Sequence, residues 1–138
     1  MQRVINMLVV SILEADIFGE ELYPIMRNTL TDIMNQEQVG LVIAAGDSKG
    51  MIYRLLSEMA TERPDVFFTI LLSNDRLAYE GGDSGLFTLD CDLVYGDPSS
   101  VKQRRRETLI QRSDIVICRK RHCDGIREIN RYCEIVVV

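Results

Sequence analysis

Short apolar segments alternate with amphipathic segments along the whole chain. The apolar segments are rich in Val, Ile and Leu, which is typical of strands buried on both faces of a sheet. The amphipathic segments repeat apolar residues at three- and four-residue spacing, which is typical of helices with one buried stripe. The order of segments is β-α-β-α-β, a loop, and β-α-β-α-β. This order predicts an α/β fold of the Rossmann-like type, with a doubly wound, mostly parallel sheet and helices on both faces.

The bounds of these segments follow from their periodicity and from the Gly and Pro residues between them. Strands are expected at residues 4–12, 39–45, 65–72, 87–95, 114–118 and 134–138. Helices are expected from about residue 19 to 34, from 51 to the turn at Pro64, from about 99 to 112, and from 125 to about 133. A glycine-rich loop is expected at residues 73–85. The length of 138 residues predicts one domain, residues 1–138.

The composition predicts a folded protein that does not cross a membrane. Apolar residues make up 46% of the chain and charged residues 27%, which is close to the average for globular proteins and argues against disorder. No apolar run approaches the roughly 20 residues of a membrane-spanning helix, and the chain does not open with the pattern of a secretory signal. The four cysteines form no CxxC pair, so reduced thiols in a cytoplasmic protein are expected.

Charge is divided unevenly between the two parts of the chain. Residues 1–100 carry 6 Lys and Arg against 16 Asp and Glu, whereas residues 101–138 carry 10 against 5. The basic C-terminal part is consistent with an anion site, and mutual neutralisation of the two parts in the folded protein is the simpler interpretation. The net charge of −5 disfavours nucleic acid as a partner, because a polyphosphate would be repelled at long range.

Ligands of doubly wound folds bind beyond the C-terminal ends of the strands, so the loops that follow strands hold the candidate site residues. The first such loop is Gly46-Asp47-Ser48-Lys49-Gly50. Its glycines let the backbone approach a ligand, and the free amides at the start of the following helix favour an anion. Gly46, Ser48, Lys49 and Gly50 are therefore candidate ligand-binding residues. A tight turn with a solvated lysine explains the same residues, because the loop matches neither GxGxxG nor the P-loop pattern.

A second candidate region is Lys102-Gln103-Arg104-Arg105-Arg106, near the start of the third expected helix. Arginine side chains match the geometry of phosphate and carboxylate groups. Basic residues in a first helical turn oppose the helix dipole, and a bound anion would offset that cost. A solvated basic face explains the run as well, and at most one or two of the three arginines can reach one site.

The third region is His122-Cys123-Asp124-Gly125, which precedes the last expected helix. Gly125 again permits close approach of the backbone to a ligand. Glu128 lies one turn into that helix, within reach of the strand ends, although a glutamate on a helix surface is the more common situation. His122 is the only histidine, and the cysteine spacings match no standard zinc pattern, so no metal site is expected.

Taken in order, these regions resemble the loops of the SLOG superfamily (the SMF/DprA and LOG group of Rossmann-like proteins), in its YpsA-like branch. Gly46 and Gly50 stand where that branch has the first and last glycines of a Gly-Gly-Ala-x-Gly loop, with Asp47 in place of the second. Arg105-Arg106 stands where the branch has an Arg-Asn pair. The similarity also includes Leu109-Ile110, residues 113–117, Asp124-Gly125-Ile126 and residues 62–72, and so spans nearly the whole chain.

The resemblance implies a cytoplasmic nucleotide-binding protein whose glycine loops form the pocket and whose Arg105 lies near the phosphate. The implied ligand-binding residues are Gly46, Ser48, Lys49, Gly50, Arg105, Asp124 and Gly125, and no cofactor is expected. Three functions stay open. They are a binding or sensing module for a nucleotide-like small molecule, an N-glycosidic hydrolase or transferase that uses Glu128 or Asp124, and an adaptor with a vestigial pocket. The missing second glycines and the acidic Asp47 favour binding or an adaptor over catalysis, and a homo-oligomer is compatible with all three.

Overall fold

The computed structural model describes residues 7–14, 17–46, 50–72, 87–90 and 98–138. Within these residues the chain forms one six-stranded sheet in the order β4-β3-β2-β1-β5-β6, and every neighbouring pair of strands is parallel. The strands are β1 (Leu8–Ile12), β2 (Val39–Gly46), β3 (Phe67–Leu72), β4 (Phe87–Asp90), β5 (Ile115–Cys118) and β6 (Glu134–Val137). The predicted doubly wound α/β fold is therefore confirmed.

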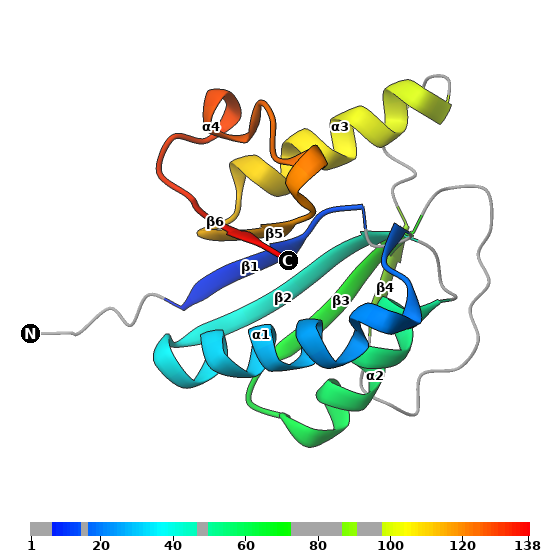
Figure 1. The fold of residues 1–138 in the computed structure, drawn as a ribbon, viewed down its shortest axis with the longest axis vertical. Coiled ribbons are helices and arrows are strands. Elements are labelled where there is room, and N and C mark those ends of the chain that lie inside the picture. Colours follow the sequence, from blue (N-terminus) through cyan, green and yellow to red (C-terminus); the bar gives the residue numbers. More distant parts are fainter. Residues whose placement is uncertain (1–6, 15–16, 47–49, 73–86, 91–97) are drawn as a thin grey trace, which may run out of the picture.

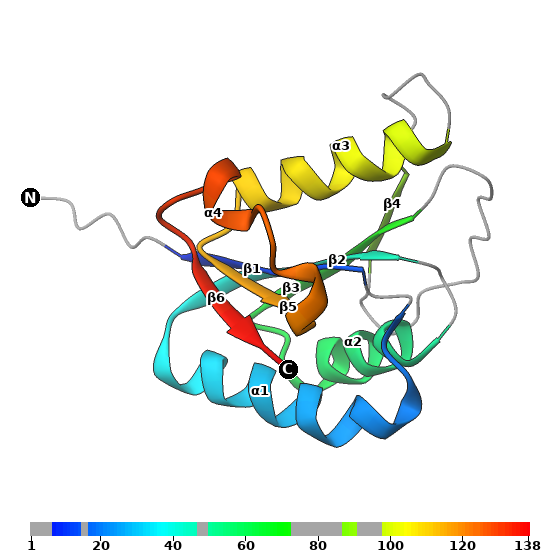
Figure 2. The same ribbon diagram turned by 45° about the horizontal axis from the view of Figure 1, so that its top comes forward.

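Helices cover both faces of the sheet (Figures 1 and 2). On one face lie α1 (Tyr23–Gln36), which follows a short 3-10 turn at Glu20–Leu22, and α2 (Met51–Glu62). On the other face lie α3 (Pro98–Gln111) and the short α4 (Ile126–Ile129). A second 3-10 turn, Lys120–His122, lies between β5 and α4.

The alternation of side chains along the central strands explains this arrangement. In β5 all four residues are buried. Ile115 and Ile117 belong to the apolar core beneath α1 and α2, whereas Val116 and Cys118 belong to the core beneath α3 and α4. A strand that is apolar on both faces needs a helical layer on each side, because burial of apolar area is the main favourable term in folding.

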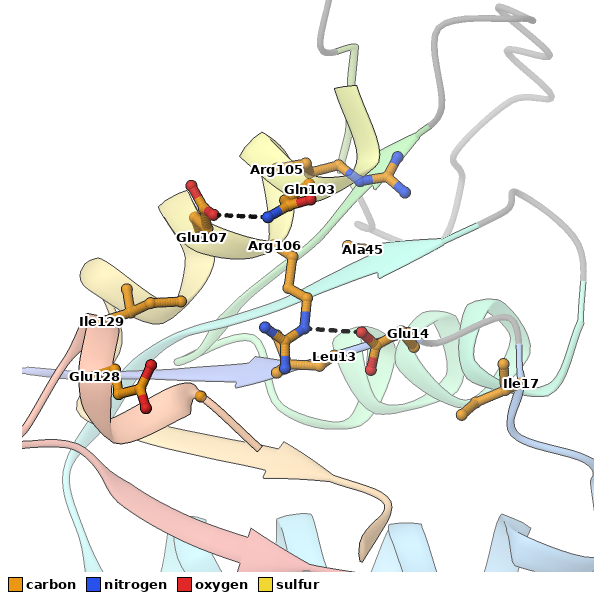
Figure 3. A pocket seen from close by; sticks show the side chains of 11 residues that line it. Leu13, Glu14, Ile17, Ala45, Gln103, Arg105, Arg106, Glu107, Glu128 and Ile129 are labelled. Carbon is orange, nitrogen blue, oxygen red and sulfur yellow. Dashed lines mark hydrogen bonds and ion pairs between the residues drawn. The ribbon is translucent and has the colours of Figure 1, made fainter. Parts of the chain in front are cut away.

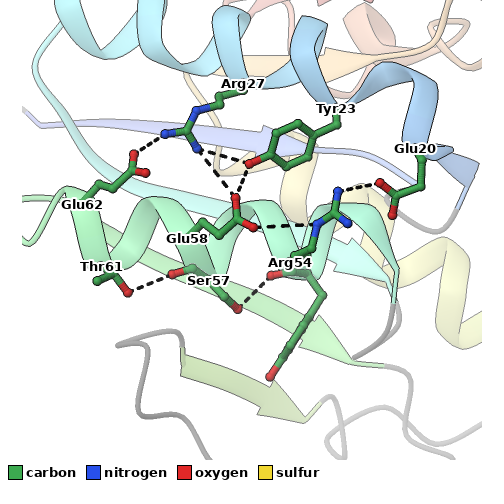
Figure 4. A network of polar contacts seen from close by, with 9 residues as sticks. Glu20, Tyr23, Arg27, Arg54, Ser57, Glu58, Thr61 and Glu62 are labelled. Atoms are coloured by element: carbon green, nitrogen blue, oxygen red, sulfur yellow. Dashed lines mark hydrogen bonds and ion pairs between the residues drawn. The ribbon is translucent and has the colours of Figure 1, made fainter.

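Polar contacts join α1 to α2 along their exposed sides (Figure 4). Arg27 pairs with Glu62, and the Tyr23 hydroxyl donates to Glu58. Arg54 pairs with Glu20 at 2.5 Å, and its guanidinium lies 4.8 Å from the centre of the Tyr23 ring. The hydrogen bond to Glu58 raises the pKa of Tyr23 above its usual value. Exposed ion pairs of this kind each stabilise a fold only slightly. The apolar core beneath α1 and α2 therefore contributes most of the free energy that holds the two helices on the sheet.

The last helix is shorter than the sequence predicts. Periodicity predicts a helix from residue 125 to about 133, but α4 ends at Ile129. Asn130 is extended, and its side-chain amide donates to the carbonyl oxygens of Ile110 and Ser113 at 2.8 and 3.0 Å. Its side-chain oxygen accepts from the backbone N–H of Tyr132 at 3.0 Å. The bond from Tyr132 gives the backbone after α4 a partner other than a helical carbonyl. Asn side chains compete with helical hydrogen bonds in this way, so Asn is disfavoured in helix interiors.

The expectation of reduced thiols is also corrected, because Cys118 and Cys123 form a disulfide. The absence of a CxxC pair gave no indication of it, since the two residues are five positions apart. Cys133 is a free, buried cysteine. The predicted loop at residues 73–85, the end of the predicted strand 87–95 and the start of the predicted strand 4–12 lie outside the described residues. No helix in the described ranges is long and apolar enough to span a membrane.

Candidate functional site

The order of the strands reverses between β1 and β5. From β1 the chain adds β2, β3 and β4 outward on one side, and then crosses to place β5 and β6 on the other side of β1. In open parallel sheets the crossovers on either side of such a switch point diverge and leave a crevice at the C-terminal ends of the strands. The candidate site lies at this crevice.

A cavity of about 650 Å³ opens there (Figure 3). Each part of its wall comes from a different element: the end of β1, the end of β2, the middle of α3, and the loop and helix that follow β5. The lining residues are Leu13, Glu14, Ile17, Ala45, Gln103, Arg105, Arg106, Glu107, Gly125, Glu128 and Ile129. The volume falls within the range of roughly 300–1,000 Å³ that is typical of small-molecule sites.

Arg105 is the most unusual residue of the wall. It is only 9% exposed, and its Nε and Nη1 atoms are buried. Neither atom has a hydrogen-bond partner within the described residues. An unpaired buried cation is unfavourable, because it has lost water and gained no anion in return. A phosphate or carboxylate group would supply the missing acceptors in the bidentate geometry that a guanidinium prefers.

Arg106 differs from Arg105 because described residues accept its hydrogen bonds. Its Nε donates to Glu14 Oε1 at 2.9 Å, and its Nη2 donates to the carbonyl oxygen of His122 at 2.8 Å. Figure 3 shows the two arginines leaving α3 in different directions, with Arg106 directed at Glu14. The run of arginines thus divides as expected from helix geometry, since consecutive residues point to different sides. Arg106 is a structural ion-pair partner, whereas Arg105 has donors that no residue of the described part of the chain accepts.

Glu14 follows β1 in a strained backbone conformation. Its φ is +47°, and it is the one non-glycine residue with positive φ in the described part of the chain. Its Oε2 atom is buried without a hydrogen bond to any residue that the structure describes, and it lies 3.7 Å from His122 Nδ1, a pairing that is ionic only when the histidine is protonated. Strained residues persist where the surrounding contacts hold them, and they cluster at functional sites. Here the bond to Arg106 holds Glu14 on the cavity wall.

Gly125 lines the cavity in the left-handed region, with a φ of +80°, and apart from its chain neighbours no described residue lies within 4 Å of the place where a Cβ would stand. Glycine adopts this conformation without strain, whereas other residues adopt it at a cost. Glu128 on α4 is exposed and directs its carboxylate to the same cavity. Gln103 donates to Glu107 at 3.2 Å on the rim formed by α3. Among the residues that the structure describes, the site thus combines the guanidinium of Arg105 with several carboxylates and an apolar wall.

Several predicted site residues come together, and others do not. Arg105, Gly125 and Glu128 line one cavity, and Gly46 follows the lining residue Ala45 at the end of β2. Gly50 immediately precedes α2, has a φ of +111° and is not part of the wall. Asp124 is exposed and is also not part of it. Ser48 and Lys49 lie outside the described residues.

Two expectations about the site need correction or addition. The arginines do not lie in a first helical turn, because α3 begins at Pro98, so the argument from the helix dipole does not apply to Arg105. Glu14 was missed, although it directly follows the first apolar run. The rule that ligands bind beyond strand ends, applied to the first strand as well, would have found it.

No three His, Cys, Asp or Glu side chains converge as a metal site would require in the ranges that the structure describes.

Comparison with known proteins leaves the family open. No protein-family model matches the chain, and no curated protein matches it. The resemblance to the SLOG superfamily therefore stays a prediction from the quoted motifs, and the case for a function depends on the geometry of the cavity.

Proposed function

We propose that the protein binds a small phosphorylated molecule of nucleotide size in the cavity at the switch point between β1 and β5. The observation that carries the proposal is Arg105, a buried guanidinium on the cavity wall with donors that no described residue accepts. Buried polar groups are normally paired, so an unpaired one on a cavity wall points to a partner that binds there.

The rest of the wall fits the other parts of a nucleoside monophosphate. Leu13, Ile17, Ala45 and Ile129 offer an apolar surface for a base. The carboxylates of Glu14, Glu107 and Glu128 are acceptors for hydroxyl and amino groups and would repel a phosphate. They therefore favour an orientation with the phosphate at Arg105 and the sugar and base toward the carboxylates. The resemblance to nucleotide-binding SLOG proteins supports the same ligand class.

Cleavage of the bond between ribose and base is a second candidate function, and the position of Glu128 on the same cavity favours it. A carboxylate can stabilise or attack the oxocarbenium-like carbon that forms when the base departs. Incubation with nucleoside monophosphates, followed by an assay for free base, separates the two functions. Release that is lost in Glu128→Gln supports catalysis, and saturable binding without release supports a binding or sensing module.

Calorimetric titration with nucleoside monophosphates tests the proposal. Arg105→Ala is expected to weaken binding by about 1.5 to 3 kcal/mol, the scale of a charge-assisted hydrogen bond within a buried site. Arg104→Ala is the matched control, because it removes the same charge from the neighbouring, exposed position of α3. Affinity is expected to stay within about twofold in the control, since exposed charges contribute little. Equal affinities for Arg105→Ala and the wild type would refute the proposal.

A further inference from the structure

The disulfide between Cys118 and Cys123 adjoins His122, a residue that contacts the ion pair of the cavity wall. Cys118 ends β5 and is fully buried, whereas Cys123 is half-buried. Their Cα atoms are 6.1 Å apart, within the range that a disulfide spans. The bond closes a short loop, residues 119–122, which ends with His122.

His122 connects that loop to the cavity. Its carbonyl oxygen accepts from Arg106 Nη2 at 2.8 Å, and its Nδ1 lies 3.7 Å from Glu14 Oε2. Arg106 in turn donates to Glu14 at 2.9 Å, a contact drawn in Figure 3. Arg106 and Glu14 both line the cavity. His122 therefore contacts both members of the charged pair on the wall.

We infer that Cys118 and Cys123 form a reversible redox switch that controls ligand binding in the cavity, an inference that rests on the proposed function. In the oxidised protein the disulfide holds His122 against Arg106 and keeps the Arg106–Glu14 pair in place. Reduction frees the loop, the pair loses its support, and the affinity for the ligand falls. A preorganised site binds more tightly because less ordering remains to be done on binding.

The structure restricts the effect of reduction to this loop. The bond joins residues only five positions apart, so it does not connect distant parts of the fold. β5 pairs with β1 on one side and β6 on the other, and Cys118 itself accepts a hydrogen bond from Val138 at 3.0 Å. The loop keeps two backbone hydrogen bonds of a single 3-10 turn, from His122 to Arg119 and from Cys123 to Lys120. The contacts of His122 with Arg106 and Glu14 and a long bond from the Ile126 N–H to the Cys123 carbonyl also hold the loop. Segments whose hydrogen bonds are this sparse open locally at low free energy.

The burial of the two sulfurs sets the course of reduction by a dithiol. A thiolate of the dithiol attacks Cys123 Sγ, the more accessible sulfur, and the Cys118–Cys123 bond breaks as Cys118 leaves and takes up a proton. The second thiol of the dithiol then attacks the dithiol's own sulfur in the mixed disulfide and releases Cys123 as a thiol. The protein gains two electrons and two protons, and the dithiol becomes a disulfide. Cys133 is not expected to attack the disulfide, because burial raises the pKa of its thiol and so lowers the fraction of reactive thiolate.

The test measures the affinity for a nucleoside monophosphate by calorimetry in wild-type protein, oxidised and then reduced with dithiothreitol. Reduction is expected to weaken binding about 5- to 100-fold, the usual range of coupling between two sites. Cys123→Ser is expected to bind like the reduced wild type and to ignore the reductant. Cys133→Ser is the matched control and is expected to keep the full redox response. Amide hydrogen exchange at residues 119–123 is expected to quicken on reduction.

The outcomes separate this inference from the proposed function. Equal affinity in the oxidised and reduced wild type overturns the switch and leaves the binding function intact. Binding in neither state overturns the binding function and the switch with it. A redox response that persists in Cys123→Ser assigns the effect to another cysteine and also overturns the switch.

Discussion

Arg105 and Arg106 are neighbours in sequence with opposite roles in the structure. Arg106 is paired with Glu14 and with the carbonyl of His122, whereas Arg105 has buried donors without a described acceptor. The sequence could single out Arg105 only through its resemblance to a family motif. It could not show which arginine is paired, because the partner Glu14 lies 92 positions away. Contacts over such separations depend on the folded topology rather than on local pattern.

Glu14→Ala is expected to lower the free energy of unfolding by about 1 kcal/mol, because it leaves Arg106, a partly buried cation, without its carboxylate. Urea denaturation followed by circular dichroism measures the change. Glu107→Ala is the control, since Glu107 also lines the cavity but accepts its hydrogen bond from Gln103, an uncharged side chain. A loss no larger than in that control would show that the Glu14–Arg106 pair does not stabilise the site.

At the scale of elements, the strands follow the apolar runs closely. β2, β3, β5 and β6 begin or end within about two residues of their predicted bounds, because burial on both faces of the sheet leaves a continuous apolar signal. The end of α4 could not be predicted in this way. It depends on Asn130, whose side chain donates to the carbonyls of Ile110, in the last turn of α3, and of Ser113, just after that helix. A side chain that satisfies the end of another helix is a tertiary contact and leaves no mark on local periodicity.

Asn130→Asp is expected to destabilise the fold by about 1 to 3 kcal/mol, because it keeps the shape and the acceptor of the side chain but removes both N–H donors to Ile110 and Ser113. Thermal or urea unfolding measures the change. Asn28→Ala on the exposed side of α1 serves as the control and is expected to be neutral or slightly stabilising, since Ala favours helices. If Asn130→Asp were as stable as the wild type, Asn130 would not be what ends α4.

At the scale of the whole molecule, the topology fixes where a ligand can bind. The predicted parallel sheet already placed candidate residues from three loops at one edge, and the structure brings Arg105, Gly125 and Glu128 to one cavity at the reversal of strand order. The shape of the cavity, the strained Glu14 and the disulfide next to His122 were not predictable, because each needs the distances between elements. A parallel sheet thus explains the position of the site, and individual contacts explain its chemistry.

If a ligand supplies the acceptors for Arg105, the buried guanidinium lowers the stability of the free protein. Arg105→Met fills a similar volume without a buried charge, so the free protein is expected to be as stable as the wild type, or more stable by about 1 kcal/mol. The same variant is expected to lose ligand binding. Urea unfolding without ligand measures the stability of the free variant. A clear loss of stability in the free protein would show that Arg105 serves the fold rather than a ligand.

The most direct measurement is a structure of the protein with a bound nucleoside monophosphate. The account predicts phosphate oxygens within hydrogen-bond distance of Arg105 Nε and Nη1, with the sugar and base toward Glu14 and Glu128. A phosphate bound elsewhere on the molecule, with the Arg105 guanidinium still unpaired or held by a carboxylate of the protein, would contradict it.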